Sequence, residues 1–146
     1  MGTTVPTQDY TLWTYEKLRY ADTDRQGHVN NAVFATMLET GRVELLYNPD
    51  DPLYGEGCAC VIASLHLDFL AEITWPGKVD VGSRVATVGR SSVTIEQGLF
   101  QDGLCAATAR TVVVQVNERS RRSHPLPDAT VQRFSELMIP TGETMA

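Results

Sequence analysis

Residues 19–46 read RYADTDRQGHVNNAVFATMLETGRVELL, and this stretch predicts the centre of the fold. Its first part is polar and contains two aspartates, a glycine, a histidine and two asparagines. Its second part, residues 32–46, is apolar on nearly every side, with Glu39, Arg42 and Glu44 as its only charges. A helix that is apolar all round is normally buried. The stretch therefore predicts a long, buried central helix with polar chemistry at its N-terminus.

The ends of this helix can also be read from the sequence. Asn30 is the expected N-cap, because its side-chain oxygen can accept a hydrogen bond from an unpaired backbone N–H of the first turn. The polar residues 22–28, with Gly27 as a flexible joint, predict a turn before the helix. The prolines and glycines of residues 48–57 predict a loop after it.

The rest of the chain predicts mainly strands. Over residues 10–20, apolar and polar residues alternate and aromatics are frequent, which favours a strand over a helix. From Cys58 onward the hydrophobic period is two, with later strands expected over residues 79–88, 93–99 and 104–116. Gly82 and Ser83 are expected to disturb the phase of the first of these later strands. The order of elements predicts an α+β fold, with one antiparallel sheet of about five strands wrapped around one helix.

Two short signals complete this reading. Asp102 and Gly103 predict a hairpin turn between the last two strands. A short C-terminal helix is expected over residues 128–137, with Asp128 as its cap.

Length and charge limit the classes of function. The 146 residues suggest one domain, 1–146, with flexible ends at about 1–9 and 139–146. A net charge of −6 argues against a nucleic-acid partner, because no basic field gathers phosphates. No apolar run is long enough for a membrane span, and no secretory signal is recognisable, so no membrane association is expected.

Cysteine usage points to a reducing compartment. Cys58, Cys60 and Cys105 are odd in number and have no C-x-x-C spacing. A zinc site or a disulfide framework would need more cysteines at recognisable intervals. We therefore expect free thiols, a cytoplasmic location and no metal site.

The polar run has a specific resemblance. YADTDRQGHVNN at residues 20–31, followed by that helix, resembles the hotdog-fold acyl-CoA thioesterases of the 4-hydroxybenzoyl-CoA thioesterase and YbgC-like type. Its second half is also similar to the motif of acyl-ACP thioesterases. Further similar residues are Asp68-Phe69-Leu70, Gly89-Arg90-Ser91-Ser92 and Leu126-Pro127. The resemblance extends over roughly residues 11–137. It implies a hotdog fold and hydrolysis of an acyl-CoA or acyl-carrier-protein thioester to a free acid and a thiol.

The resemblance implies roles for three residues near the helix start. Asp24 matches the family's catalytic carboxylate and would act as nucleophile or general base. The backbone N–H of Asn31 matches the family's oxyanion donor, which suits the positive end of a helix. His28 could protonate the leaving thiolate or polarise the carbonyl. Asp22 is interpreted as a residue that shapes the turn.

Each of these roles has an alternative. Asp24 could merely cap the turn, His28 could be bonded to it, and Asn30 could serve only as the helix cap. Glu39 stands where a related branch of the superfamily has its catalytic carboxylate, but an i,i+3 pair with Arg42 is the simpler explanation.

Basic residues suggest a site for coenzyme A. The family binds the pantetheine arm along the turn that matches Gly89, Arg90, Ser91 and Ser92, and the nucleotide at the surface, often with residues from two subunits. Arginine forks match the phosphates of coenzyme A. The predicted coenzyme A residues are therefore Gly89, Arg90, Ser91, Ser92, Arg119, Arg121 and Arg122, and Asn30 at the helix start is a further predicted substrate-binding residue. A solvated hairpin end is an equally good explanation of the arginines.

The sequence leaves three functions to compare. The first is a thioesterase that needs no cofactor beyond the coenzyme A of its substrate. The second is a hotdog enoyl-CoA hydratase or dehydratase, and the third is an acyl-CoA binding module without catalysis. A single hotdog leaves an open sheet edge, so a homodimer is expected, with pairing into a homotetramer as a further option.

Overall fold

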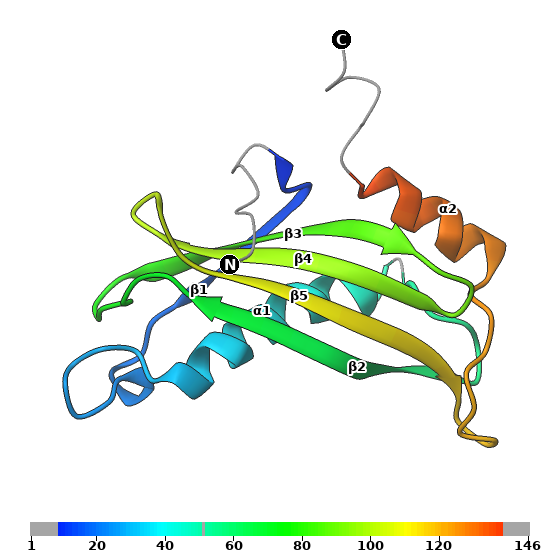
Figure 1. Ribbon diagram of the computed structural model, residues 1–146, viewed down its shortest axis with the longest axis horizontal. Helices are drawn as coiled ribbons and strands as arrows, with labels where there is room; N and C mark the ends of the chain where they lie inside the picture. Colours follow the sequence, from blue (N-terminus) through cyan, green and yellow to red (C-terminus); the bar gives the residue numbers. More distant parts are fainter. Residues whose placement is uncertain (1–8, 51, 139–146) are drawn as a thin grey trace, which may run out of the picture.

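The computed structural model describes residues 9–50 and 52–138. It contains a five-stranded antiparallel sheet in the order β1-β3-β4-β5-β2, with α1 lying across one face (Figure 1). A mixed α+β fold with one antiparallel sheet and a helix is confirmed. The ends predicted to be flexible lie outside the described residues, except for Asp9. The elements, in chain order, are β1 Leu12–Lys17, the 3-10 turn η2 Tyr20–Asp22, α1 Asn31–Leu46, β2 Cys58–Phe69, β3 Lys78–Val88, β4 Ser92–Gln101, β5 Leu104–Asn117 and α2 Asp128–Glu136.

Alternation along β1 decides which of its residues face α1. Thr14 donates a hydrogen bond from Oγ1 to Glu44 Oε2 at 2.9 Å, and Glu16 Oε2 accepts one from Thr40 Oγ1 at 3.0 Å. Trp13, which precedes Thr14, lies on the opposite face, with its ring 5.7 Å from that of Tyr10. The strand predicted from this alternation is therefore confirmed.

Two hydrophobic clusters join α1 to the sheet. The first contains Phe34, Met37 and Leu38 of α1, packed on Val79, Val81 and Leu99 of the sheet. The second contains Leu45 and Leu46 together with residues of β3 to β5 and of α2, among them Phe134. Each half of α1 thus has its own core, and burial of these side chains fixes the direction of the helix across the sheet.

Gly41 allows α1 to approach the sheet closely. A Cβ atom at this position would lie 2.6 Å from Nε2 of Gln97, 2.9 Å from Cγ1 of Val81 and 3.0 Å from Oγ of Ser83. These distances are shorter than van der Waals contact, and two of the three atoms belong to short side chains that cannot swing away. The glycine is required by packing, although it lowers the intrinsic helix propensity.

Three sequence expectations are wrong in detail. Burial of α1 on nearly every side does not hold in the single chain, because the sheet covers only one side and Val43 remains 44% exposed. Gly82 and Ser83 do not interrupt β3, and the register with β4 shifts at Val85 instead. Asp128 is the first residue of α2, and Pro127 occupies the N-cap position without a capping side chain.

No helix in the described part of the chain is both long and apolar enough to cross a membrane. The three cysteines are free thiols.

Replacement of Gly41 by alanine tests the close approach. We expect Gly41→Ala to lower the free energy of unfolding by about 1–3 kcal/mol, because overpacking outweighs the gain of about 1 kcal/mol in helix propensity. Urea denaturation measures the change. Thr36→Ala, at an exposed position of the same helix, is the control and should stay within about 0.5 kcal/mol. An equally stable or more stable Gly41→Ala protein would contradict the packing argument.

Candidate active site

Asp24 organises the loop in which it stands. Its Oδ1 accepts hydrogen bonds from the backbone N–H of Gln26 at 2.8 Å and of His28 at 3.2 Å. Its own N–H donates to the His28 carbonyl at 2.7 Å, and Gly27 has φ +83°, which favours glycine. Asp24 therefore does cap its own turn through Oδ1. Within the described residues, Oδ2 has no hydrogen-bond partner, so one carboxylate oxygen stays available for chemistry.

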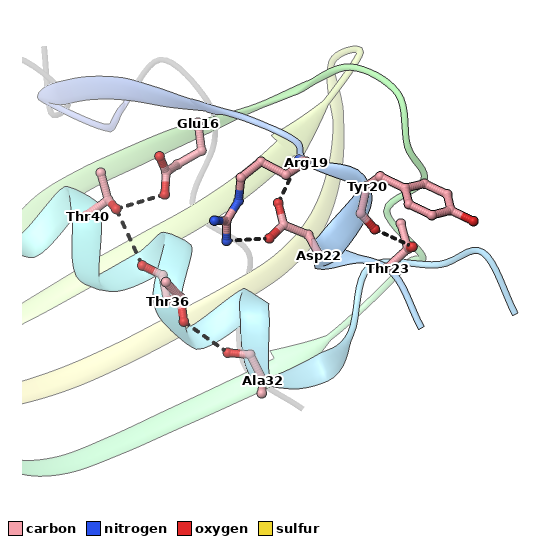
Figure 2. A network of polar contacts seen from close by, with 8 residues as sticks. All are labelled: Glu16, Arg19, Tyr20, Asp22, Thr23, Ala32, Thr36 and Thr40. Atoms are coloured by element: carbon pink, nitrogen blue, oxygen red, sulfur yellow. Dashed lines mark hydrogen bonds and ion pairs between the residues drawn. The ribbon is translucent and has the colours of Figure 1, made fainter. Parts of the chain in front are cut away.

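Asp22 ties the end of β1 to the start of α1. Its carboxylate accepts hydrogen bonds from the backbone N–H and the guanidinium of Arg19, both at 2.8 Å (Figure 2). Its carbonyl accepts a hydrogen bond from the Asn30 N–H at 2.9 Å. Burial alone would raise the pKa of Asp22, but the two hydrogen bonds and the charge of Arg19 outweigh it and hold the pKa below its usual range. The interpretation of Asp22 as a turn-shaping residue agrees with these contacts.

The N-terminus of α1 leaves one donor free at this loop. Asn30 caps the helix, with its Oδ1 accepting from the Ala32 N–H at 2.9 Å. The backbone N–H of Asn31 has no acceptor in the part of the chain that the structure describes. A free N–H in the first turn, at the positive end of the helix dipole, can stabilise an oxyanion.

His28 is held from the opposite side by the segment after β2. Its Nε2 lies 3.1 Å from Oε2 of Glu72, and its backbone forms a bridge with Thr74. Val29 N–H donates to the Ile73 carbonyl at 2.8 Å. The alternative in which His28 is bonded only to its own turn does not describe the side chain. Its partner is the carboxylate of Glu72, which belongs to another segment.

These groups meet in one pocket of about 410 Å³. It is lined by Asp24, His28 and Asn31, which are three of the four predicted catalytic residues. Phe34 and Phe69, whose ring centroids are 5.0 Å apart, form an apolar wall. Carboxylate, imidazole and helix N-terminus therefore face a common space beside an apolar surface, which suits attack on a carbonyl that carries an apolar group.

Glu39 lies elsewhere in the single chain. It faces a smaller pocket of about 160 Å³, farther along α1, together with Arg42, Cys60 and Ile62. No ion pair joins Glu39 to Arg42 within the described residues, so the i,i+3 pair expected from the sequence is not formed.

The predicted coenzyme A residues lie at the other end of the sheet. Gly89 to Ser92 connect β3 to β4, and the Gly89 N–H bonds to the Ser92 carbonyl at 2.8 Å. Arg119, Arg121 and Arg122 follow β5 directly. Figure 1 shows both turns at the ends of β3 and β5, opposite the loop that begins α1. One chain alone does not bring these residues to the Asp24 pocket.

Sequence reasoning missed one residue of the site and one pocket elsewhere in the chain. Glu72 is an ordinary exposed acid in the sequence, and only the bridge between His28 and Thr74 brings it to the histidine. A third pocket of about 410 Å³, between β1 and the C-terminal half of α1, was also not expected. It holds none of the predicted catalytic residues.

No group of three His, Cys, Asp or Glu side chains suited to a metal ion occurs among residues 9–50 and 52–138.

Comparison with known proteins shows the family of the chain. Residues 18–134 match the model of the thioesterase-like superfamily. The chain belongs to the thioesterase-like superfamily. No curated protein matches the chain.

Solved structures agree with the family. The PA5185 protein of Pseudomonas aeruginosa is 28% identical with a TM-score of 0.79, over 91% of this chain and 95% of that one. A predicted thioesterase of Bacillus stearothermophilus is also 28% identical with a TM-score of 0.79, over 86% and 95%. A thioesterase of Thermus thermophilus, solved with coenzyme A and Zn, is 29% identical with a TM-score of 0.77, over 90% and 97%. These neighbours imply the hotdog fold and support thioester hydrolysis in general.

The Asp22 contacts predict a pH-dependent stability. The pKa of Asp22 is lower in the folded chain than in the unfolded one, so its contribution is present above the unfolded value of about 3.9 and is lost as pH falls further. Asp22→Asn should cost roughly 1 kcal/mol at pH 7, a value kept small because Arg19 is exposed. The difference from wild type should shrink below about pH 4.

Urea denaturation at pH 7, 5 and 3 measures this difference, with Asp50→Asn in an exposed loop as the control. A difference that is the same at all three pH values would argue against the role of the carboxylate charge.

Proposed function

We propose that this protein hydrolyses acyl-CoA thioesters, with Asp24 as the catalytic carboxylate. The observation that carries the proposal is the shared pocket of Asp24, His28 and Asn31 at the N-terminus of α1. Coenzyme A is favoured over a carrier protein because a related thioesterase is described in complex with coenzyme A. The finer likeness to the 4-hydroxybenzoyl-CoA and YbgC-like thioesterases belongs to the same proposal, and no cofactor or metal is required.

Each group has a part in the reaction. Asp24 Oδ2 attacks the thioester carbonyl or takes a proton from a water that attacks it. The carbonyl oxygen becomes negative and accepts a hydrogen bond from the Asn31 N–H, a kind of contact worth about 2.7–4 kcal/mol in the transition state. The carbon–sulfur bond then breaks, and His28 gives a proton to the thiolate. If Asp24 is the nucleophile, water then hydrolyses the mixed anhydride that it has formed, which releases the acid and restores the carboxylate. If Asp24 is the base, the acid is released directly and Asp24 returns its proton to solvent. Glu72 holds His28 in place.

A second copy of the chain would complete the site. β2 is a twelve-residue edge strand without proline or lysine, and its Ile62 and Phe69 are 50% and 49% exposed. Such an edge invites pairing with another strand. Antiparallel pairing of two β2 strands reverses the sheet, so that the Gly89–Ser92 turn and Arg119 to Arg122 of one copy come to the end where the other copy has Asp24. A homodimer would therefore unite the predicted catalytic and coenzyme A residues, and dimers could pair further into a tetramer.

Two other functions remain as outcomes of the test. A hotdog hydratase or dehydratase would use the same Asp24 and His28 to turn over enoyl-CoA or 3-hydroxyacyl-CoA without releasing thiol. A binding module would retain acyl-CoA and leave it unchanged. Glu39 is the alternative carboxylate.

Thiol release from a panel of aliphatic and aromatic acyl-CoAs tests the proposal. Wild type should release thiol, and Asp24→Asn should lose roughly 10²–10⁴-fold in kcat, because a positioned acid or base typically contributes that much. Glu39→Gln, which removes a carboxylate of α1 that lies outside the Asp24 pocket, is the matched control. Release that survives in Asp24→Asn and is lost in Glu39→Gln would move the chemistry to Glu39. If wild type releases no thiol from any of the acyl-CoAs, the hydrolase proposal is wrong.

Leu65→Glu tests the dimer. Leu65 is an exposed residue of β2, so the change should leave the single chain folded but place an unpaired charge in the interface. Analytical ultracentrifugation should then report monomers, and thiol release should fall with dissociation. Leu104→Glu, at an exposed position near the β4–β5 turn, should keep both the dimer and the activity. An active Leu65→Glu monomer would contradict a site built from two chains.

A further inference from the structure

The Asp24 pocket has two kinds of lining. Its polar side chains, beside the start of α1, are Asp24, Gln26, His28 and Glu72. Its apolar side chains are Val29, Phe34, Phe69, Leu70 and Ala71. His28 pairs with Glu72, and the ring of Phe34 packs on that of Phe69, so like groups stand together. The apolar part of an acyl thioester is its acyl group, and burial therefore directs this group toward the two phenylalanines.

Phe34 stands one helical turn beyond the oxyanion donor. Residues three apart lie on the same side of a helix, and about 4.5 Å along the axis separates Asn31 from Phe34. Side chains of a helix lean toward its N-terminus, so the Phe34 ring covers the turn that begins at Asn31. An acyl chain that leaves a carbonyl group at the Asn31 N–H and follows α1 therefore meets this ring after only a few carbons.

The Phe34 ring is a rigid end wall. It is 3% exposed and belongs to the core cluster that also contains Met37 and Leu38 of α1. Neither Met37 nor Leu38 lines the Asp24 pocket, so the ring separates the pocket from the core. A close-packed core does not make room for extra methylene groups without strain. A chain that is longer than the space in front of Phe34 therefore does not fit.

Phe69 limits the pocket on the side of β2. Its ring centroid is 5.0 Å from that of Phe34, with an interplanar angle of 62°, and it is 49% exposed. The segment after it is fixed to β5, because the N–H groups of Leu70 and Ala71 donate to the Ala106 carbonyl at 2.8 and 3.1 Å. Edge-to-face packing of two rings can be extended by a third ring, so a single aromatic ring suits this wall as well as a short chain does.

We propose that Phe34 sets the upper length of the acyl group, so that the substrates carry a short aliphatic chain, of butanoyl to hexanoyl length, or one aromatic ring. The inference rests on the proposed function, because it takes the thioester carbonyl to lie between Asp24 and Asn31. The pocket volume of about 410 Å³ agrees, since it is near the lower end of the range of small-molecule sites and the thioester fills part of it. Phe34 is then a specificity-determining residue that takes no part in bond making.

A series of acyl-CoAs of increasing chain length gives the first test. In wild type, kcat/KM for thiol release should rise about fourfold for each CH₂ group from acetyl-CoA to butanoyl-CoA or hexanoyl-CoA, because each group is buried beside the apolar wall. The value should rise no further at octanoyl-CoA and decanoyl-CoA. A kcat/KM that continues to rise through decanoyl-CoA overturns the proposal.

Truncation of Phe34 should move the limit to longer chains. The neighbours of Phe34 from β5 in the core cluster are Ala106, Ala107 and Ala109, which are too small to fill the space of a lost ring. In Phe34→Ala, the ratio of kcat/KM for octanoyl-CoA to that for hexanoyl-CoA should rise roughly tenfold over wild type, as expected for two more buried CH₂ groups. Phe34→Leu should show a smaller rise in the same direction.

Met37→Ala is the matched control for loss of core packing. It truncates a 2% exposed side chain of the same helix and the same cluster but leaves the lining of the Asp24 pocket intact. Its stability should fall as that of Phe34→Ala does, while its chain-length limit stays that of wild type. A shift in Met37→Ala as large as in Phe34→Ala, or an unchanged limit in both Phe34 variants, overturns the proposal. If Phe34→Ala does not fold, Phe34→Leu decides, because it removes less volume.

Binding separates this inference from the proposed function. If wild type releases no thiol, the function is wrong, and calorimetric titration with the same acyl-CoAs still tests the length limit. The dissociation constant should then fall about fourfold for each CH₂ group up to hexanoyl-CoA and level off beyond it. Binding that does not depend on chain length, or no binding, overturns the inference. If wild type releases thiol equally well from every chain length, the function holds and the inference alone fails.

Discussion

The hydrogen bonds of Asp22 are the constraint on which the site depends. The carboxylate holds the end of β1 through Arg19, while the carbonyl of the same residue holds Asn30 at the start of α1. The loop between these anchors has only a few residues in which to place Asp24 and His28. Its geometry is therefore set from both ends, and the first turn of α1 is presented to the pocket without help from a ligand. Preorganisation of this kind is what electrostatic stabilisation of a transition state requires.

Much of the fold could be predicted from hydrophobic period. The apolar run of residues 32–46 and the period of two after Cys58 gave the element types, and Asn30 marked the helix start. Arg42 could not be placed correctly from residue type, because arginine is rarely buried. Helical spacing would have placed it better, since position 42 shares a face with Leu38 and Leu45.

The candidate site was predictable in part for a different reason. Asp24, His28 and Asn31 are neighbours in sequence, so a local motif was enough to bring them together. Glu72 reaches His28 only through tertiary structure, and no local signal marks it. The coenzyme A residues lie at the wrong end of the single chain, and the order of elements could have indicated this, because Gly89 follows the far end of a strand that begins near Leu18.

The two edges of the sheet are not equivalent, and this limits how the protein can assemble. β1 has only six residues, and beyond it Met138 forms a parallel bridge to Val85 of β3, while Thr11 Oγ1 donates to the Leu137 carbonyl at 2.6 Å. The C-terminal segment thus occupies part of the edge that β1 leaves open. Growth of a sheet from molecule to molecule needs two free edges that fit one another. One long free strand and one short, partly occupied edge favour a closed pair of chains over open-ended growth of the sheet, even though β2 is apolar and exposed.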